Sequence, residues 1–287
     1  MDWVGAPDSI RDGVLTESLL SGMDAVGVER AVLFPTAAEY EGWAQQVAST
    51  WPGRFTCVRC FDYGSTVGSG LLDPMSPDVD AHVSDLRDSP HVSGLRIVVS
   101  FTPEGLRRFQ EGLWDRAIAA CEKHGMPLFV FCSGHLDVAH SIAMRYPGLS
   151  LVVDHLGMKQ PPAEEVESPA WRRIPDLLDL AQFPNVAVKM CGVPSLSSEP
   201  YPHEDTWGHV RQIVDAFGAS RIMWASDISR FRGRLGWRPG PSQDRSQVVR
   251  DRPTYAASLS LFRDTALLTE DEKRWVLGDT ARRVLIW

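Results

Sequence analysis

Seven short apolar runs, each followed by a helical pattern, dominate this sequence. They are bounded by turn residues and are predicted to be strands buried on both faces. The runs cover residues 30–35, 54–63, 92–101, 126–132, 149–155, 185–193 and 221–227. A helix is predicted before the first run over 15–27, and helices are predicted between the runs over about 38–51, about 79–88, 113–125, 135–148, 171–184 and 203–218. Two or three further helices are predicted to close the chain after the last run and a long loop. Strict alternation at this spacing predicts parallel strands joined by right-handed crossovers.

The length of the chain fits one barrel. It has 287 residues, and a (β/α)8 TIM-type barrel typically needs about 250. No linker or second core is visible, so we predict a single barrel domain over 1–287. Seven strands are one short of eight, because residues 1–14 are turn-rich and are predicted to be irregular. The first strand is therefore not evident, and the barrel is expected to be incomplete. A loop rich in Arg, Gly and Pro covers 228–253.

Charge and hydropathy exclude several classes of function. The formal net charge is −8 and no basic stripe is present, which argues against nucleic acid or an anionic membrane as a partner. No apolar run approaches the ~20 residues of a membrane span, and the N-terminus lacks the basic and apolar regions of a signal peptide. We therefore expect a cytoplasmic protein with a small-molecule substrate. Phosphate-binding and serine-hydrolase motifs are missing from the sequence.

The five cysteines show no disulfide framework. Cys57 and Cys60 form a C-x-x-C that would suggest zinc or redox chemistry in a loop. They lie within a predicted strand, however, where an offset of three residues places the two thiols on opposite faces. We therefore predict core cysteines in a reducing compartment.

Two polar residues at strand ends are candidates for chemistry. The stretch Leu149–Pro161 places His155 directly after a buried strand, and Asp227 ends the last strand. Active-site residues of parallel α/β folds gather at the carboxyl ends of the strands. Asp227 would serve as a general base or metal ligand, and His155 could bind a metal, polarise a carbonyl or carry a proton. The structural alternatives are a hydrogen-bonded core histidine and a carboxylate that braces the following loop.

Two charges inside apolar strands also need an explanation. Arg96 and Lys189 must face a cavity or a partner, because burial of an isolated charge is costly. They could hold the carboxylate of a substrate, or form a structural ion pair with Asp62 or Asp154. In the loops after two strands, His135 and His203 are further candidates for substrate contact.

The chain resembles the amidohydrolase-related family, in the branch that holds lactonases and non-oxidative decarboxylases on a (β/α)8 barrel. VVDHLG and MWASD are the most specific of the matching motifs, and GLRIVVS, GMPLFVFCSG and NVAVKMCG follow the family's order and spacing. The resemblance implies that His155 is the strand-six histidine and Asp227 the strand-eight aspartate. It is also compatible with a homodimer.

Two departures from the family bear on metal binding. The family's first strand carries an H-x-H metal-binding pair, and nothing before Leu15 supplies it. The place of the strand-five histidine is held by Phe131. The sequence therefore leaves open whether one divalent metal (zinc or manganese) or none is bound. A bound metal would use His155 and Asp227 and would recruit a further ligand such as Cys132.

The resemblance implies a hydrolase that opens a lactone, or a similar ester or amide, in a small carboxylated metabolite. Asp227 would take a proton from water and His155 would polarise the carbonyl. Arg96 and Lys189 would hold the negative charge of the substrate, and Arg230 would contact it from the long loop. The alternatives are a metal-dependent non-oxidative decarboxylase and a catalytically silent barrel that serves as a binding or scaffold protein.

Overall fold

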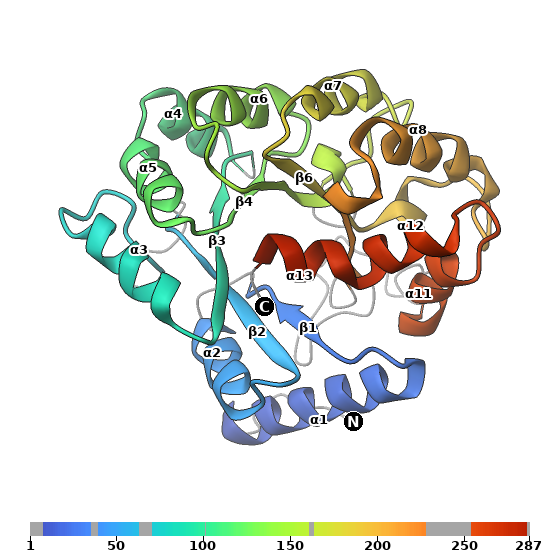
Figure 1. Cartoon of the computed structure of the whole chain (residues 1–287), viewed down its shortest axis with the longest axis horizontal. Helices are drawn as coiled ribbons and strands as arrows, with labels where there is room; N and C mark the ends of the chain where they lie inside the picture. The colour runs from blue at the N-terminus through green and yellow to red at the C-terminus, as the bar shows by residue number, and fades with distance from the viewer. Residues whose placement is uncertain are drawn as a thin grey trace, which may run out of the picture.

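A computed structural model describes residues 8–35, 40–62, 71–100, 102–160, 164–227 and 254–285 (Figure 1). Its centre is one sheet of seven strands, which lie side by side in the order of the sequence. The strands are β1 (Ala31–Leu33), β2 (Phe55–Cys60), β3 (Val92–Val98), β4 (Leu128–Phe131), β5 (Leu151–Val153), β6 (Val186–Met190) and β7 (Ile222–Trp224). Every neighbouring pair is parallel. The predicted strands, their direction and their alternation with helices are confirmed.

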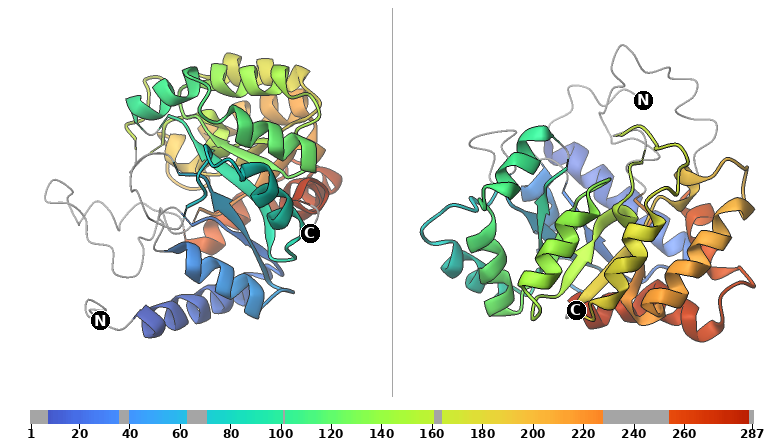
Figure 2. Two further views of the ribbon diagram at one scale, coloured as in Figure 1. Left: turned by 90° about the vertical axis from the view of Figure 1, so that its left-hand side faces the viewer. Right: turned by 90° about the horizontal axis from the view of Figure 1, so that it is seen from above.

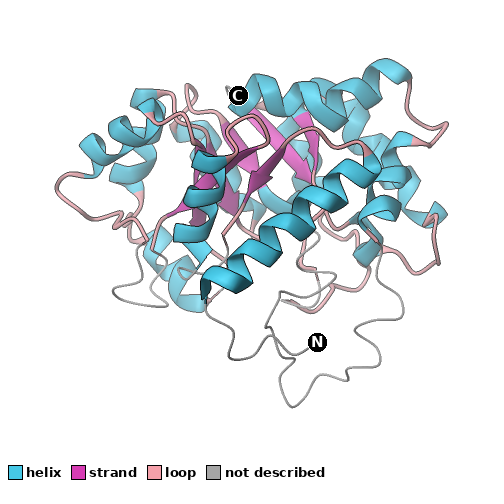
Figure 3. Ribbon diagram, turned by 90° about the horizontal axis from the view of Figure 1, so that it is seen from below, coloured by secondary structure: helices cyan, strands magenta, loops and turns pink. Residues whose placement is uncertain are grey.

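The fold is of the incomplete (β/α)-barrel type that the sequence predicts. Among the described residues no strand precedes β1, and β1 and β7 form the two edges of the curved sheet. Helices surround the strands (Figure 2, Figure 3). They are α1 (Asp8–Val26), α2 (Glu41–Thr50), α3 (Val79–Asp88), α4 (Pro103–Gln110), α5 (Asp115–His124), α6 (Leu136–Arg145), α7 (Ile174–Asp179), α8 (Trp207–Phe217), α11 (Tyr255–Arg263), α12 (Glu270–Arg274) and α13 (Thr280–Leu285). None of the described helices is long and apolar enough to cross a bilayer.

Two helices differ from the prediction. The first helix was expected to begin at Leu15, but α1 begins at Asp8, so half of the segment predicted to be irregular is helical. Helix α4 was not predicted, although its start is marked in the sequence. The Thr102 hydroxyl accepts a hydrogen bond from the Gly105 backbone N–H, and Pro103 occupies the first turn.

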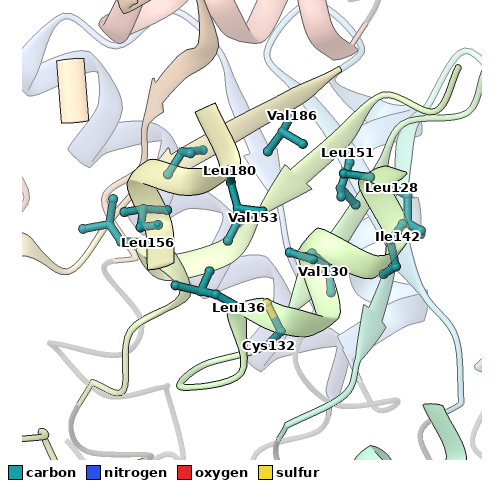
Figure 4. Packing of buried hydrophobic residues seen from close by; sticks show 14 of the residues in the cluster. Leu128, Val130, Cys132, Leu136, Ile142, Leu151, Val153, Leu156, Leu180 and Val186 are labelled. Carbon is teal, nitrogen blue, oxygen red and sulfur yellow. The ribbon is translucent and has the colours of Figure 1, made fainter. Parts of the chain in front are cut away.

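The outward face of the sheet packs against the helices. Because successive strand residues point to opposite faces, Val130 of β4 and Val153 of β5 point outward, and they join Leu136 and Ile142 of α6 in the largest buried cluster (Figure 4). Cys132 lies in the same cluster, with its thiol among apolar neighbours. This packing accounts for the continuous apolar runs, since both faces of each strand are covered.

The inward face changes character along the strands. Nearer the strands' amino ends it is apolar, and α13 contributes two residues to the same cluster. The buried members of this cluster are Val58, Phe129, Val152, Ala187, Met223, Val284 and Leu285. Two residues after Val152 and Ala187 the chain carries charged residues, Asp154 directly after β5 and Lys189 in β6. Arg96 of β3 joins them, since both cations pair with Asp154. The interior is therefore closed by apolar packing at one end and polar toward the carboxyl ends of the strands.

The prediction that Cys57 and Cys60 are core residues on opposite faces of their strand is confirmed. Cys57 packs outward with Ala44 and Val47 of α2, whereas Cys60 packs with Val98 and Phe131 in a separate cluster. Burial raises the pKa of both thiols to about 12, so both remain protonated core residues near neutral pH.

Candidate functional site

His155 and Asp227 meet at the carboxyl ends of the strands. His155 follows β5 by two residues, and Asp227 follows β7 by three. The Nε2 atom of His155 lies 3.6 Å from Oδ2 of Asp227, with 12% and 21% of the two side chains exposed. Both groups are thus largely buried yet reachable from solvent.

Both residues have an unusual backbone. The φ angle is +53° at His155 and +45° at Asp227, in the left-handed region that residues other than glycine seldom adopt. Gly157 closes the turn after β5, and a Cβ atom there would lie 2.2 Å from a methyl carbon of Leu136. The close packing against α6 holds this turn in place. Such conformations persist where the surrounding structure enforces them, and they cluster at functional sites.

Cys191 is the third member of the cluster, and the sequence analysis missed it. It follows β6, the strand between those that carry the other two residues. One donor atom each from His155, Cys191 and Asp227 lies within 4.8 Å of the others. The signal was present, because Cys191 stands at a strand end like its two neighbours. Cys132, suggested instead as a further ligand, has its thiol in the hydrophobic core.

Gln160 connects two of these strand ends. Its side-chain N–H₂ donates to the backbone carbonyl oxygens of His155 and Cys191, both at 3.2 Å. Gln160 is 1% exposed, so both hydrogen bonds are shielded from water. The carboxamide therefore fixes the two loops relative to each other.

Asp154, beside His155, holds the two buried cations. Its Oδ2 accepts a hydrogen bond from Nε of Arg96 at 2.7 Å, and its Oδ1 lies 2.7 Å from Nζ of Lys189. Burial opposes ionisation of Asp154, but the charges of Arg96 and Lys189 outweigh it and hold the pKa of that carboxyl well below its ordinary range. Asp154, one of the two partners considered from the sequence, thus forms ion pairs with both cations.

Aromatic rings enclose this charged group. Lys189 Nζ lies 4.0 Å from the ring centre of Phe34, and Cζ of Arg96 lies 5.4 Å from that of Phe131, within the range of cation–π attraction. The ring of Phe131 packs edge-on against His155, with the ring centres 5.4 Å apart. The charged group and the His155 cluster are therefore adjacent.

Electrostatics also links the two groups. Burial lowers the pKa of Arg96, but the negative charges around it, that of Asp154 above all and that of Asp227 among the others, raise it overall. A protonated His155 would likewise contribute to lowering the pKa of Asp154. A change in the charge of His155 or Asp227 therefore changes the electrostatic energy of the buried ion pairs of Asp154.

The remaining candidates are not members of the His155 cluster or lie outside the described residues. His135 stands at the start of α6 and is half-buried. His203 is 8% exposed, and its Nδ1 is 2.8 Å from the Glu199 carbonyl within its own loop. Neither belongs to the group of converging donor atoms. Arg230 and the loop 228–253 lie outside the described residues.

The donor set of the cluster fits a transition-metal ion. An imidazole nitrogen, a thiolate sulfur and a carboxylate oxygen are the three ligand types that zinc takes in proteins. His155, Cys191 and Asp227 would hold the ion.

A curated lactonase is similar in sequence to part of this chain. The chain is 32% identical over 173 residues to L-fucono-1,5-lactonase from Burkholderia ambifaria, over 58% of this chain and 57% of that enzyme. It thus matches little more than half the length of this relative.

Solved structures share the fold. An amidohydrolase from Burkholderia multivorans with bound zinc superposes with a TM-score of 0.71 and 19% identity, over 99% of this chain and 93% of that one. A candidate 2-pyrone-4,6-dicarboxylic acid hydrolase from Pseudomonas putida gives 0.63 and 19%, over 94% and 86%. The amidohydrolase family model matches residues 9–286, nearly the whole chain. The chain therefore belongs to the amidohydrolase family.

Proposed function

We propose that this protein is a lactonase-type hydrolase that opens a lactone, or a similar ester, in a small carboxylated metabolite. The observation that carries the proposal is the approach of His155 Nε2 to Asp227 Oδ2, 3.6 Å apart, at the carboxyl ends of the strands. Proton transfer during ring opening needs a base and a hydrogen-bond donor, and a carboxylate beside an imidazole provides both. The similarity to L-fucono-1,5-lactonase supports this substrate class.

The proposed reaction adds water to the lactone carbonyl. Asp227 accepts a proton from the attacking water while His155 donates a hydrogen bond to the carbonyl oxygen, which becomes an oxyanion. Collapse of the oxyanion breaks the ring C–O bond, and protonated Asp227 returns the proton to the departing ring oxygen. The product is the open hydroxy acid, and Asp227 is again ionised. A divalent ion at the cluster, when bound, would be held by His155, Cys191 and Asp227; it would polarise the carbonyl in place of the His155 hydrogen bond and lower the pKa of the attacking water.

Arg96 and Lys189 are proposed to bind the negative charge of the substrate. They carry two positive charges against the single negative charge of Asp154, so the group as a whole keeps one positive charge. Fixed charge near a developing oxyanion is among the largest contributions to catalysis. His135, His203 and Arg230 stay as proposed substrate contacts. A cytoplasmic location is also proposed, because none of the five cysteines forms a disulfide.

Hydrolysis assays with an Asp227→Asn variant test the proposal. Wild-type protein is assayed by acid release with aldono-1,5-lactones, L-fucono-1,5-lactone included, and with 2-pyrone-4,6-dicarboxylate. Loss of the general base should lower kcat by about 100- to 10,000-fold. Asp215→Asn is the matched control, because this carboxylate lies on α8 with 65% of its side chain exposed, and its kcat should equal that of wild type.

Three results would contradict the proposal. Full activity in Asp227→Asn would remove this residue from the mechanism. Release of CO₂ from aromatic carboxylates without ring opening would favour the decarboxylase. Binding of these compounds without turnover would favour the silent barrel.

A further inference from the structure

We propose that His155, Cys191 and Asp227 form a three-ligand zinc site in which the Cys191 thiolate selects zinc over manganese. The three donor atoms lie within 4.8 Å of one another. They follow β5, β6 and β7, three neighbouring parallel strands, so the sheet itself sets the spacing of the ligands. The sulfur ligand follows the middle strand, and the imidazole and carboxylate ligands follow the strands on either side of it.

The distances fit two ligands of one ion. At 3.6 Å, the gap between His155 Nε2 and Asp227 Oδ2 is too long for a hydrogen bond. Bonds of about 2.0–2.2 Å to a tetrahedral zinc place a nitrogen and an oxygen ligand roughly 3.4 Å apart. With a Zn–S bond of about 2.3 Å the corresponding spacing to sulfur is roughly 3.6 Å. The Cys191 thiol, at most 4.8 Å away, therefore has to approach by no more than about 1 Å.

The chemistry of the donors determines the metal. Thiolate ligands favour zinc, whereas manganese prefers carboxylate, carbonyl and water oxygens. Three protein ligands leave the fourth tetrahedral position open, which is the arrangement of catalytic rather than structural zinc sites. Partial exposure of His155 and Asp227 leaves room for water at that position.

The protein holds the ligands in place without the ion. Gln160 fixes the backbone at His155 and Cys191 through its two hydrogen bonds. The left-handed conformations at His155 and Asp227 are likewise properties of the chain itself. Little rearrangement is then needed on binding, which favours affinity.

Zinc binding to the full chain tests the inference without any substrate, so it can fail or succeed independently of the lactonase proposal. Metal-free protein is titrated with Zn²⁺ and with Mn²⁺ against a chromophoric chelator. We expect one zinc per chain, bound more tightly than manganese. Loss of a metal ligand's hydrogen-bond partner alone costs about 10- to 100-fold in affinity. Cys191→Ser should therefore weaken zinc binding by at least about 100-fold and change manganese binding much less.

Cys132→Ser is the matched control, because Cys132 is also buried directly after a strand but lies in the apolar core. Its zinc affinity should match that of wild type. Cobalt substitution of wild-type protein gives a second readout that does not depend on the folding of a variant. A thiolate-to-cobalt charge-transfer band is expected, and it should be retained in Cys132→Ser. Absence of this band in wild type, or equal zinc affinity in wild type and folded Cys191→Ser, would overturn the inference.

Discussion

Asp154 supplies the negative charge that stabilises the two buried cations inside the sheet. It is fully buried and paired with both Arg96 and Lys189. Asp154→Asn would leave two buried cations without a counter-charge, and breaking a buried pair in this way costs about 3–5 kcal/mol. We expect the free energy of unfolding in urea to fall by that amount. Asp80→Asn removes an exposed pair with Lys123, which solvent screens, and should change the free energy of unfolding far less; equal losses would contradict the interpretation.

The ion pairs of Asp154 also predict that the free energy of unfolding depends on pH. The pKa of Asp154 is lower in the folded protein than in the unfolded chain, where it is about 3.9. Its stabilisation is therefore complete above about pH 4 and is lost as the pH falls toward the folded pKa. The difference in unfolding free energy between wild type and Asp154→Asn should shrink below about pH 4. A difference that stays constant between pH 6 and pH 3 would show that the charge of Asp154 is not its source.

For single residues, the sequence showed which positions are unusual better than it showed which side chains they contact. A charged or polar residue in an apolar run needs an explanation, and this singled out His155, Asp227, Arg96 and Lys189. Cys191 was missed because a thiol is also an ordinary core residue, so its position at a strand end, although visible in the sequence, did not by itself mark a ligand. Only the register of the strands brings its sulfur toward the other two donors.

Between elements, the loops after β5 and β6 depend on Gln160. Gln160→Leu removes the donor for two backbone carbonyl oxygens, and an unsatisfied buried polar group costs about 1–3 kcal/mol. The free energy of unfolding should fall accordingly. Gln182→Leu is the control, because its side chain also makes two hydrogen bonds, to Asp179, but at the surface. That variant should stay within about 0.5 kcal/mol of wild type; a comparable loss there would count against the role of Gln160.

The type and order of the elements were predictable, because periodicity and turn residues are local signals. The limits of α1 and the existence of α4 were not predicted. Helix α4 has a Thr cap followed by Pro103, a start signal that lies directly after the run predicted as a strand. In α1 the residues before Leu15 include glycine and several charges, and such a polar segment shows no apolar periodicity.

Across the whole molecule, α13 at the end of the described chain completes the core at its centre. Leu285 is 2% exposed and packs in one cluster with Phe129 and Met223 from the sheet. The local pattern of α13 could not predict this contact, because its partners are spread over the whole sheet. If α13 is an integral part of the core, its loss should destabilise the whole sheet rather than fray one end.

Leu285→Ala tests this at the scale of the molecule. Removal of a buried leucine side chain costs about 2–5 kcal/mol, so the free energy of unfolding should fall by that amount. Far-ultraviolet circular dichroism and tryptophan fluorescence should report one shared transition, since a cooperative core unfolds as a unit. Leu267→Ala, at a residue that is 54% exposed, should change stability by less than about 0.5 kcal/mol. An early, separate helical transition in Leu285→Ala would mean that α13 only covers the sheet and does not hold its interior together.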